Sequence, residues 1–207
     1  PLDSSAASDV YKRQDQDFQV LVELRNEVSG VVACSMLCTF ADQSIAAQLH
    51  RIADHMSPED IGHAWPRGIQ RNLNLHSLSL DDALGLGFRV IGAGVIESNE
   101  CSAQDLLMPH HCMGRISDSM PHLWGAVFPE SQASEEEGGA VVEFRRTYHE
   151  LLMAGDAFQV VSGIVEVGAR VQSFAHLMFN LRTGHCCVNA AMTCTCLLYT
   201  SPSPRDV

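Results

Sequence analysis

Apolar and polar residues alternate near both ends of the chain, and each alternation is interrupted by a short turn with a glycine. Residues 18–25 and 31–40 flank Gly30, and residues 171–181 and 185–195 flank Gly184. Apolar, β-branched runs on either side of a glycine turn predict an antiparallel hairpin. Aligning the two glycines also places Thr39 on Thr193, which indicates an internal repeat of about 150 residues.

Between these hairpins, the pattern predicts one long helix and three further strands. Apolar side chains recur at three- and four-residue spacing after Pro109, which suits a first helical turn. These positions are Met113, Ile116, Met120, Leu123, Trp124 and Val127. We expect Pro121 to kink or end the helix, because proline lacks the amide hydrogen. Strands are predicted over residues 88–97, 141–149 and 157–167, the first with glycines that permit a bulge.

The charge balance excludes two classes of partner. The net charge is -12 and the hydrophobic fraction is 46%. An acidic chain lacks the clustered Lys and Arg that bind phosphates, so we expect no nucleic acid and no anionic membrane surface as partner. No apolar run approaches the ~20 residues of a membrane helix.

Both ends of the chain resemble translated sequencing-adapter sequence. Asp9 to Gln14 and Cys196 to Asp206 match the two strands of a transposon adapter read in frame. We therefore expect residues 1–14 and 196–207 to be artefacts. The natural part is then predicted to be a fragment of residues 15–195.

The cysteines predict a reducing compartment and no metal. Seven of the eight cysteines lie within residues 15–195, an odd number at irregular spacing, which favours buried thiols in a cytoplasmic protein over a disulfide framework. Cys101 with His110, His111 and Cys112 could suggest zinc, but the spacing of a known zinc site is missing. No glycine-rich phosphate loop is present either, so neither metal nor organic cofactor is expected.

The second half of the chain resembles a hot-dog domain of the acyl-CoA thioesterase type. The resemblance is carried by Tyr148 at a strand end, a Gly155-Asp156 turn, Ser162-Gly163 in a strand and the Thr183-Gly184 hairpin. It implies an α+β fold in which an antiparallel sheet wraps one long helix. The segment around Glu100 and the helix start is similar to tandem (double) hot-dog proteins. Residues 88–195 would be the second repeat, residues 15–44 the last hairpin of a truncated first repeat, and residues 45–87 a linker.

The resemblance implies hydrolysis of an acyl-CoA or acyl-carrier thioester. Such enzymes use a carboxylate in the loop before the helix, or on the helix, and amide donors at the helix start. Here Ser102, Leu106 and Met108 stand where related catalytic loops carry Asp, His and Asn, so most of the active site is expected in the first repeat. The candidate catalytic residues are Ser102, Asp105 and Asp118, and the candidate substrate contacts are Glu100, Leu106, Leu107, Met108 and Gly114.

Several alternatives stay open. Asp105 could instead cap the helix, and Asp118 could be solvated or face a partner repeat. The domain could be a non-catalytic module that stabilises its partner or binds acyl groups. It could also be a hot-dog dehydratase, with His110 or His111 paired to Asp118. In each case the resemblance implies a homo-oligomer through sheet pairing, since a half-built sheet leaves an open edge.

Overall fold

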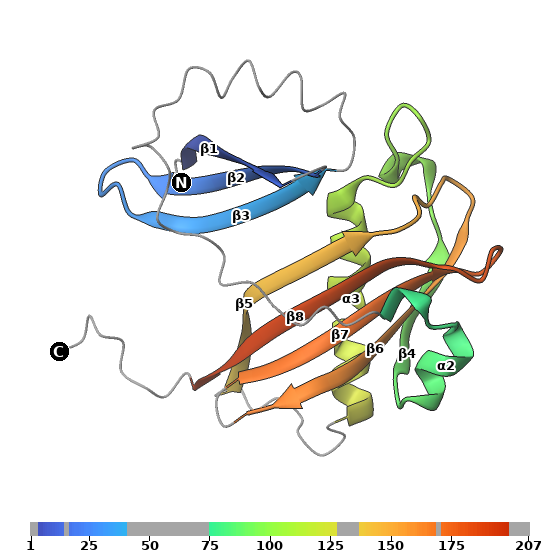
Figure 1. Cartoon of the computed structure of the whole chain (residues 1–207). Helices are drawn as coiled ribbons and strands as arrows, with labels where there is room; N and C mark the ends of the chain where they lie inside the picture. The colour runs from blue at the N-terminus through green and yellow to red at the C-terminus, as the bar shows by residue number, and fades with distance from the viewer. Residues whose placement is uncertain (1–3, 15–16, 41–74, 128–136, 169–170, 199–207) are drawn as a thin grey trace. The chain divides into compact units, whose positions relative to one another are not determined.

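The computed structural model describes residues 4–14, 17–40, 75–127, 137–168 and 171–198, and it divides the chain into two compact units (Figure 1). The first unit comprises Pro1–Arg67 and the second comprises Gly68–Val207. The first contains a three-stranded antiparallel sheet in the order β1-β2-β3. Its strands are β1 (Ser4–Gln14), β2 (Asp17–Asn26) and β3 (Val32–Phe40).

The second unit is a five-stranded antiparallel sheet with one long helix. The strands are β4 (Arg89–Val95), β5 (Glu137–Tyr148), β6 (Ala157–Val167), β7 (Val171–Asn180) and β8 (Cys186–Leu198), arranged in the order β4-β6-β7-β8-β5. The helix α3 (Pro109–Val127) connects the two edge strands and lies along one face of the sheet (Figure 1). This strand order, with the helix between the first and second strands, is the hot-dog fold, and it confirms the expected α+β class.

The main core lies between α3 and the sheet. Cys112, Ile116 and Leu123 of α3 are buried, and Met120 and Trp124 pack beside them. Trp124 meets Phe174 of β7 edge to face, with ring centroids 5.2 Å apart. The predicted apolar stripe is confirmed, although Cys112 and not Met113 makes its first buried contact. Pro121 does not end the helix, since the carbonyl that it leaves without a donor belongs to exposed Ser117.

A short helix covers part of the opposite face of the sheet. It is α2 (Leu80–Gly85), preceded by the 3-10 turn η2 (Leu75–Ser77), and its Ala83 is fully buried. Ala83 packs in a cluster with Val161, Leu177, Phe179 and Cys186. Ser79 and Asp82 form a capping box, and the Ser-x-x-Asp spacing is a helix start signal in the sequence. The rest of the stretch predicted as a linker, residues 45–74, lies outside the described residues.

The two predicted hairpins have the same turn. Asn26 donates its N–H to the carbonyl of Val31 (2.9 Å), and its carbonyl accepts from Gly30 (2.8 Å). Asn180 makes the same two bonds, to His185 (3.0 Å) and from Gly184 (2.8 Å). In both turns the asparagine Oδ1 accepts two further amides, from Val28 and Ser29 in one and from Arg182 and Thr183 in the other. Both glycines have positive φ, +67° and +75°, which glycine adopts without steric cost.

The two hairpins also share their strand register. Leu24 pairs with Cys34 and Arg25 with Val32, so the register shifts between them. Met178 pairs with Val188 and Phe179 with Cys186, with the same shift at the same place. Every one of these positions is related by the offset that aligns Gly30 with Gly184. The bulge, the turn and the strand register are therefore the same in the two hairpins.

The bulge determines which face each cysteine of β8 occupies. Strict alternation along residues 185–195 would place Cys186 on the same face as Val188, and Cys187 on the other face. The extra residue at the bulge reverses this locally: Cys187 packs with Val188 in the core under α3, and Cys186 joins the opposite cluster. The two cysteines do lie on opposite faces, as expected.

The approach of α3 to β4 depends on Gly92. A Cβ built at Gly92 would overlap Ser119 Oγ and would lie 3.1 Å from Ser119 Cβ. The register of β4 against β6 also shifts between Val90 and Gly92, which confirms the predicted bulge.

We expect Gly92→Ala to lower the free energy of unfolding by about 1–3 kcal/mol, because overpacking displaces the helix. Adding Ser119→Ala should recover a large part of this loss. Gly125→Ala on the same helix meets no atom within 4 Å and should not destabilise the protein. Urea denaturation measures all four proteins, and a Gly92→Ala variant as stable as wild type would contradict this close approach.

Candidate functional site

The loop before α3 is fixed by backbone hydrogen bonds to the segment that follows β5. The loop begins with the 3-10 turn η3 (Ser98–Glu100). Leu107 donates its N–H to Leu152 (2.8 Å), and Ala154 donates to the carbonyl of Asp105 (3.0 Å). These bonds tie the loop to the Gly155-Asp156 turn of the family pattern and hold it at the start of the helix.

Asp156 anchors that turn. Its Oδ2 accepts the N–H of Met153 (3.0 Å), and its Oδ1 accepts from Arg182 (3.0 Å) in the β7–β8 turn. The Met153 amide is the main cause of a lowered pKa of the Asp156 carboxyl, and Arg182 adds to it. Gly155 has φ +87°. The Gly155-Asp156 turn therefore contacts the β7–β8 turn through Arg182, the residue before Thr183-Gly184.

Glu100, expected to contact substrate, forms a buried ion pair. Arg115 of α3 donates through Nε to Oε1 (2.8 Å) and through Nη2 to Oε2 (2.7 Å), while the Glu97 amide also donates to Oε2 (2.9 Å). This bidentate arginine lowers the pKa of the Glu100 carboxyl. In this structure the pair joins the loop to the helix.

Asp105 does not cap α3, because the helix begins only at Pro109. Its N–H bonds to the carbonyl of Ser102 (3.0 Å), and its φ is +59°, the only positive value of a non-glycine among the described residues. This backbone conformation costs energy for a residue with a side chain. The carboxylate is exposed, at the tip of a turn in which Ser102 Oγ accepts the Gln104 amide (3.2 Å).

The remaining predicted residues lie on both sides of this turn. Leu107 is buried in the core under α3, whereas Leu106 and Met108 are half-buried. Gly114 is half-buried on the second turn of α3 and Asp118 is exposed on the third. Five of the predicted residues thus form one local cluster: Ser102, Asp105, Leu106, Leu107 and Met108. Asp118 lies apart from them on the helix surface.

The sequence analysis missed Arg146 of β5. Its Nη1 donates to the carbonyl of Pro109 (2.9 Å), the first residue of α3. Its guanidinium lies 5.1 Å from the ring of Tyr148 and 5.9 Å from that of Phe144. Burial raises the pKa of the Tyr148 phenol to about 12, so this hydroxyl stays protonated. The signal available was the alternation of Phe144, Arg146 and Tyr148, which puts all three on the helix side.

A buried serine–histidine pair lies in the centre of the sheet. Ser162 of β6 and His176 of β7 are both fully buried, with Oγ and Nδ1 2.6 Å apart. The Nε2 atom of His176 is buried without a hydrogen-bond partner among the described residues. Burial lowers the pKa of this imidazole from 6.5 to about 4, so it is neutral at physiological pH.

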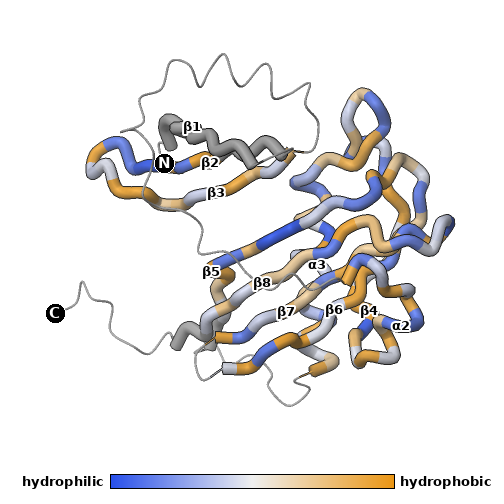
Figure 2. Tube along the Cα trace, in the orientation of Figure 1, coloured by the Kyte–Doolittle hydropathy of each residue, from blue (hydrophilic) through white to orange (hydrophobic). Residues whose placement is uncertain are grey.

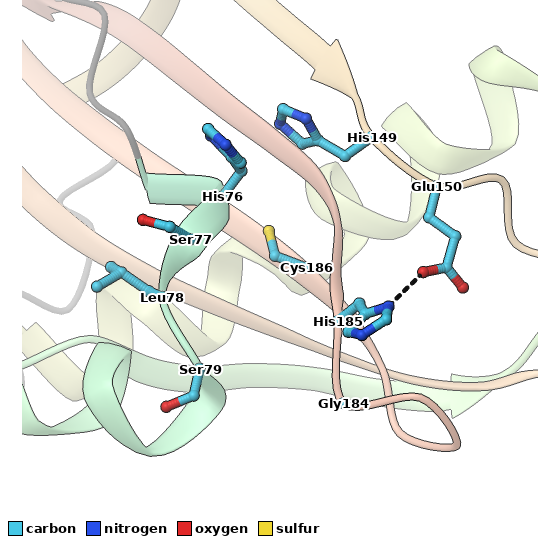
Figure 3. A pocket seen from close by; sticks show the side chains of 9 residues that line it. All are labelled: His76, Ser77, Leu78, Ser79, His149, Glu150, Gly184, His185 and Cys186. Atoms are coloured by element: carbon cyan, nitrogen blue, oxygen red, sulfur yellow. Dashed lines mark hydrogen bonds and ion pairs between the residues drawn. The ribbon is translucent and has the colours of Figure 1, made fainter.

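A histidine-rich pocket lies beside the sheet face that α2 covers (Figure 3). It has a volume of about 380 Å³ and is lined by residues of η2 and the two that follow it, by His149 and Glu150 directly after β5, and by the start of β8 with the two residues before it. The rings of His76 and His149 stack at 4.5 Å, and His185 Nδ1 lies 3.0 Å from Glu150 Oε2. Burial raises the pKa of the Cys186 thiol to about 11, so it is no nucleophile at neutral pH.

Two further observations concern metals and membranes. Within the described ranges, no group of three His, Cys, Asp or Glu side chains is placed to hold a metal ion, and this includes the residues considered for zinc. In the same part of the chain, no helix is long and apolar enough to cross a membrane.

Comparison with known proteins finds solved structures that are similar to this chain. No family model and no curated protein matches the chain. YbaW, a probable thioesterase from Escherichia coli, is similar at 9% identity and TM-score 0.48, over 54% of this chain and 85% of that chain. A hypothetical protein from Staphylococcus aureus in complex with CoA is similar at 12% identity and TM-score 0.48, over 57% and 78%. A 1,4-dihydroxy-2-naphthoyl-CoA thioesterase from Synechocystis is similar at 8% identity and TM-score 0.46, over 55% and 88%. The hot-dog fold of this chain rests on its own strand order and helix packing.

The neutral His176 predicts acid sensitivity. Its folded pKa of about 4 lies below the unfolded value of 6.5, so the unfolded chain binds the proton first as the pH falls. The contribution of neutral His176 is complete above about pH 6.5 and is lost between about pH 6.5 and 4, up to about 3 kcal/mol. Urea denaturation at about pH 7.5 and about pH 5 measures this loss.

The matched control is the double variant Ser162→Ala/His176→Val, which places at 176 the residue found at the equivalent position 22. It should lose less stability on acidification than the wild type does. Equal losses in the two proteins would assign the acid sensitivity to other groups.

Proposed function

We propose that the chain is part of a tandem hot-dog protein that hydrolyses acyl thioesters such as acyl-CoA. The observation that carries the proposal is the exposed carboxylate of Asp105, held by strained backbone in the loop that leads into α3. Strained conformations persist where the surrounding structure enforces them, and they concentrate at functional sites. The motifs of the acyl-CoA thioesterase pattern support the same assignment. Asp156 accepts bonds from the Met153 amide and from Arg182, next to Thr183-Gly184, and so holds the segment to which this loop is hydrogen-bonded.

In the proposed reaction, Asp105 acts as general base. It takes a proton from water as the water oxygen bonds to the thioester carbonyl carbon. The negative charge that develops on the carbonyl oxygen is stabilised by the start of α3, where His110 has the first amide hydrogen because Pro109 has none. The carbon–sulfur bond then breaks, the thiolate receives the proton, and a carboxylic acid and a thiol leave.

The other predicted residues have supporting roles in this proposal. The hydroxyl of Ser102 can still donate its proton to the water or substrate, since its oxygen only accepts the Gln104 amide. Half-buried Leu106 and Met108, with Gly114 on the helix, would contact the acyl chain beside the buried Leu107. Glu100 would act indirectly, by holding the loop on Arg115.

The first repeat would supply the larger part of the active site and would complete the pocket around Asp105. The identical turn, bulge and register of the β2–β3 and β7–β8 hairpins support a duplicated domain. Asp118, exposed on α3, would then face the other repeat. The reaction would take place in the cytoplasm; none of the seven cysteines with described side chains forms a disulfide.

A non-catalytic hot-dog module is the second candidate. It is favoured by Ser102, Leu106 and Met108, which replace the polar residues of related catalytic loops. In the dehydratase alternative, His110 or His111 would pair with Asp118, whereas in the described residues the rings of His110 and His111 contact each other, with centroids 4.2 Å apart.

The activity test uses the protein with the complete first repeat that the proposal requires, and a panel of acyl-CoA substrates of different chain lengths. Thiol release reports hydrolysis. We expect Asp105→Asn to lower kcat by about 100-fold or more, because the base is lost while the shape is kept. Asp81→Asn, an exposed carboxylate on α2, should leave kcat unchanged. No hydrolysis of any substrate by the unaltered protein would favour the non-catalytic module.

We also propose that copies pair through β5, whose far edge has no partner strand among the described residues. Val141 and Val142 on this strand are exposed. The chain should oligomerise in light scattering, and Val142→Lys should shift it towards monomer, because a charge protects an open edge. A monomer before the substitution would contradict the pairing.

A further inference from the structure

Strands β2 and β3 contain several hydrophobic residues (Figure 2), and one face of the hairpin that they form is apolar and exposed. Val22 and Leu24 of β2 pair with Met36 and Cys34 of β3, so all four side chains lie on this face. Leu24 is 46% exposed and Met36 is 53% exposed. Leu21 and Glu23, which alternate with them on the opposite face, are fully buried.

The second hairpin shows what covers such a face. The positions equivalent to Val22, Leu24, Cys34 and Met36 are, in that order, His176, Met178, Val188 and Ala190, which are all buried on the side of α3. The helix contacts β7 at two points along its length. Cys112 Sγ lies 3.9 Å from the Met178 sulfur, and Trp124 packs on Phe174. The position on the first hairpin that is equivalent to Met178 is Leu24.

The two faces also offer similar volumes. In the second unit, large His176 lies opposite small Ala190. In the first unit, small Val22 lies opposite large Met36. A change in one member of a cross-strand pair is thus offset by its neighbour, as expected where the same kind of element must pack on both faces. The first face differs in being entirely apolar, because valine replaces the histidine.

We infer that this face, formed by Val22, Leu24, Cys34 and Met36, is a docking surface for an amphipathic α-helix with an apolar stripe like that of α3. The helix would lie along β2 and would bury Leu24 and Met36. This surface does not depend on the proposed hydrolase activity, because it follows from the hairpin equivalence alone. If the protein had no hydrolase activity, the docking surface would still be expected, and absence of helix binding would not exclude the activity.

The test measures binding of a helix in trans to the full chain. The probe is a fluorescein-labelled peptide of residues 109–127 with Pro121→Ala, whose helicity is checked by circular dichroism. The readout is fluorescence anisotropy. We expect saturable binding, and no binding of a scrambled peptide of the same composition.

Two neighbouring residues give a matched pair of variants. Met36 and Leu37 point to opposite faces of β3, and both are exposed, so Asp should be tolerated in folding at either position. Met36→Asp should weaken peptide binding by about tenfold or more, because a charge would be buried under the helix. Leu37→Asp should leave the affinity within about twofold, since its side chain lies on the other face. This pair also separates the proposed surface from exchange of the peptide with α3 itself.

A second readout follows the exposed thiol of Cys34. Saturating peptide should slow its reaction with a maleimide, while the reaction of half-buried Cys101 in the second unit stays unchanged. Absence of peptide binding, or equal loss in the two Asp variants, would overturn the inference. So would a dimer in light scattering that Met36→Asp dissociates and the peptide does not, since a second copy would then be the occupant.

Discussion

The burial of one helix on one face of a sheet is the constraint on which the second unit depends. A single helix with an apolar stripe can be stabilised in water only by covering a surface of matching width. The strands β6, β7 and β8 provide that surface, and β4 and β5 close it at the sides. Gly92 is required because the helix must approach β4 closely enough for Ser119 to contact the strand. The same packing fixes the start of α3, and with it the geometry of the loop that carries Asp105.

Two ion pairs fix the loop before α3 and the segment to which it is hydrogen-bonded. Arg115 holds Glu100 from the helix, and Arg182 holds Asp156 from the far turn of the sheet. Each carboxylate also accepts a backbone amide, so each ion pair is directional and not merely electrostatic. Charge-assisted hydrogen bonds of this kind are stronger than neutral ones, and they set orientation as well as distance. The loop before α3 is therefore positioned by α3 and by the β7–β8 turn, which are remote from it in the sequence. The side chains that make these contacts do not need to touch a substrate.

Periodicity in the sequence was sufficient to predict the strands, the long helix and the repeated hairpin, because each has one buried face of regular spacing. It failed where regular spacing is broken. The bulge in β8 moves Cys187 to the helix side, and no alternation pattern can indicate an extra residue. Asp105 adopts a left-handed backbone conformation, and its carbonyl accepts the amide of Ala154, which is remote in the sequence. The local sequence suggested a helix cap because it contains no information on this distant partner. Arg146 was missed because it acts on Pro109, which is remote in the sequence. The asparagine shared by positions 26 and 180 is a second sequence signal for the turn that the glycines predict, because its side chain accepts the turn amides.

The two hairpins also show how little of a sequence is needed to specify a piece of backbone. Over the aligned strands the identical pairs are Asn26 with Asn180, Gly30 with Gly184 and Thr39 with Thr193. The asparagine side chain supplies the acceptor that the turn amides need, and the glycine supplies a conformation that other residues avoid. The other aligned positions differ between the two hairpins, although the turn hydrogen bonds and the register shift are the same. The backbone of this hairpin is thus specified by a few sites that serve the main chain, so its other side chains can differ without a change in the turn.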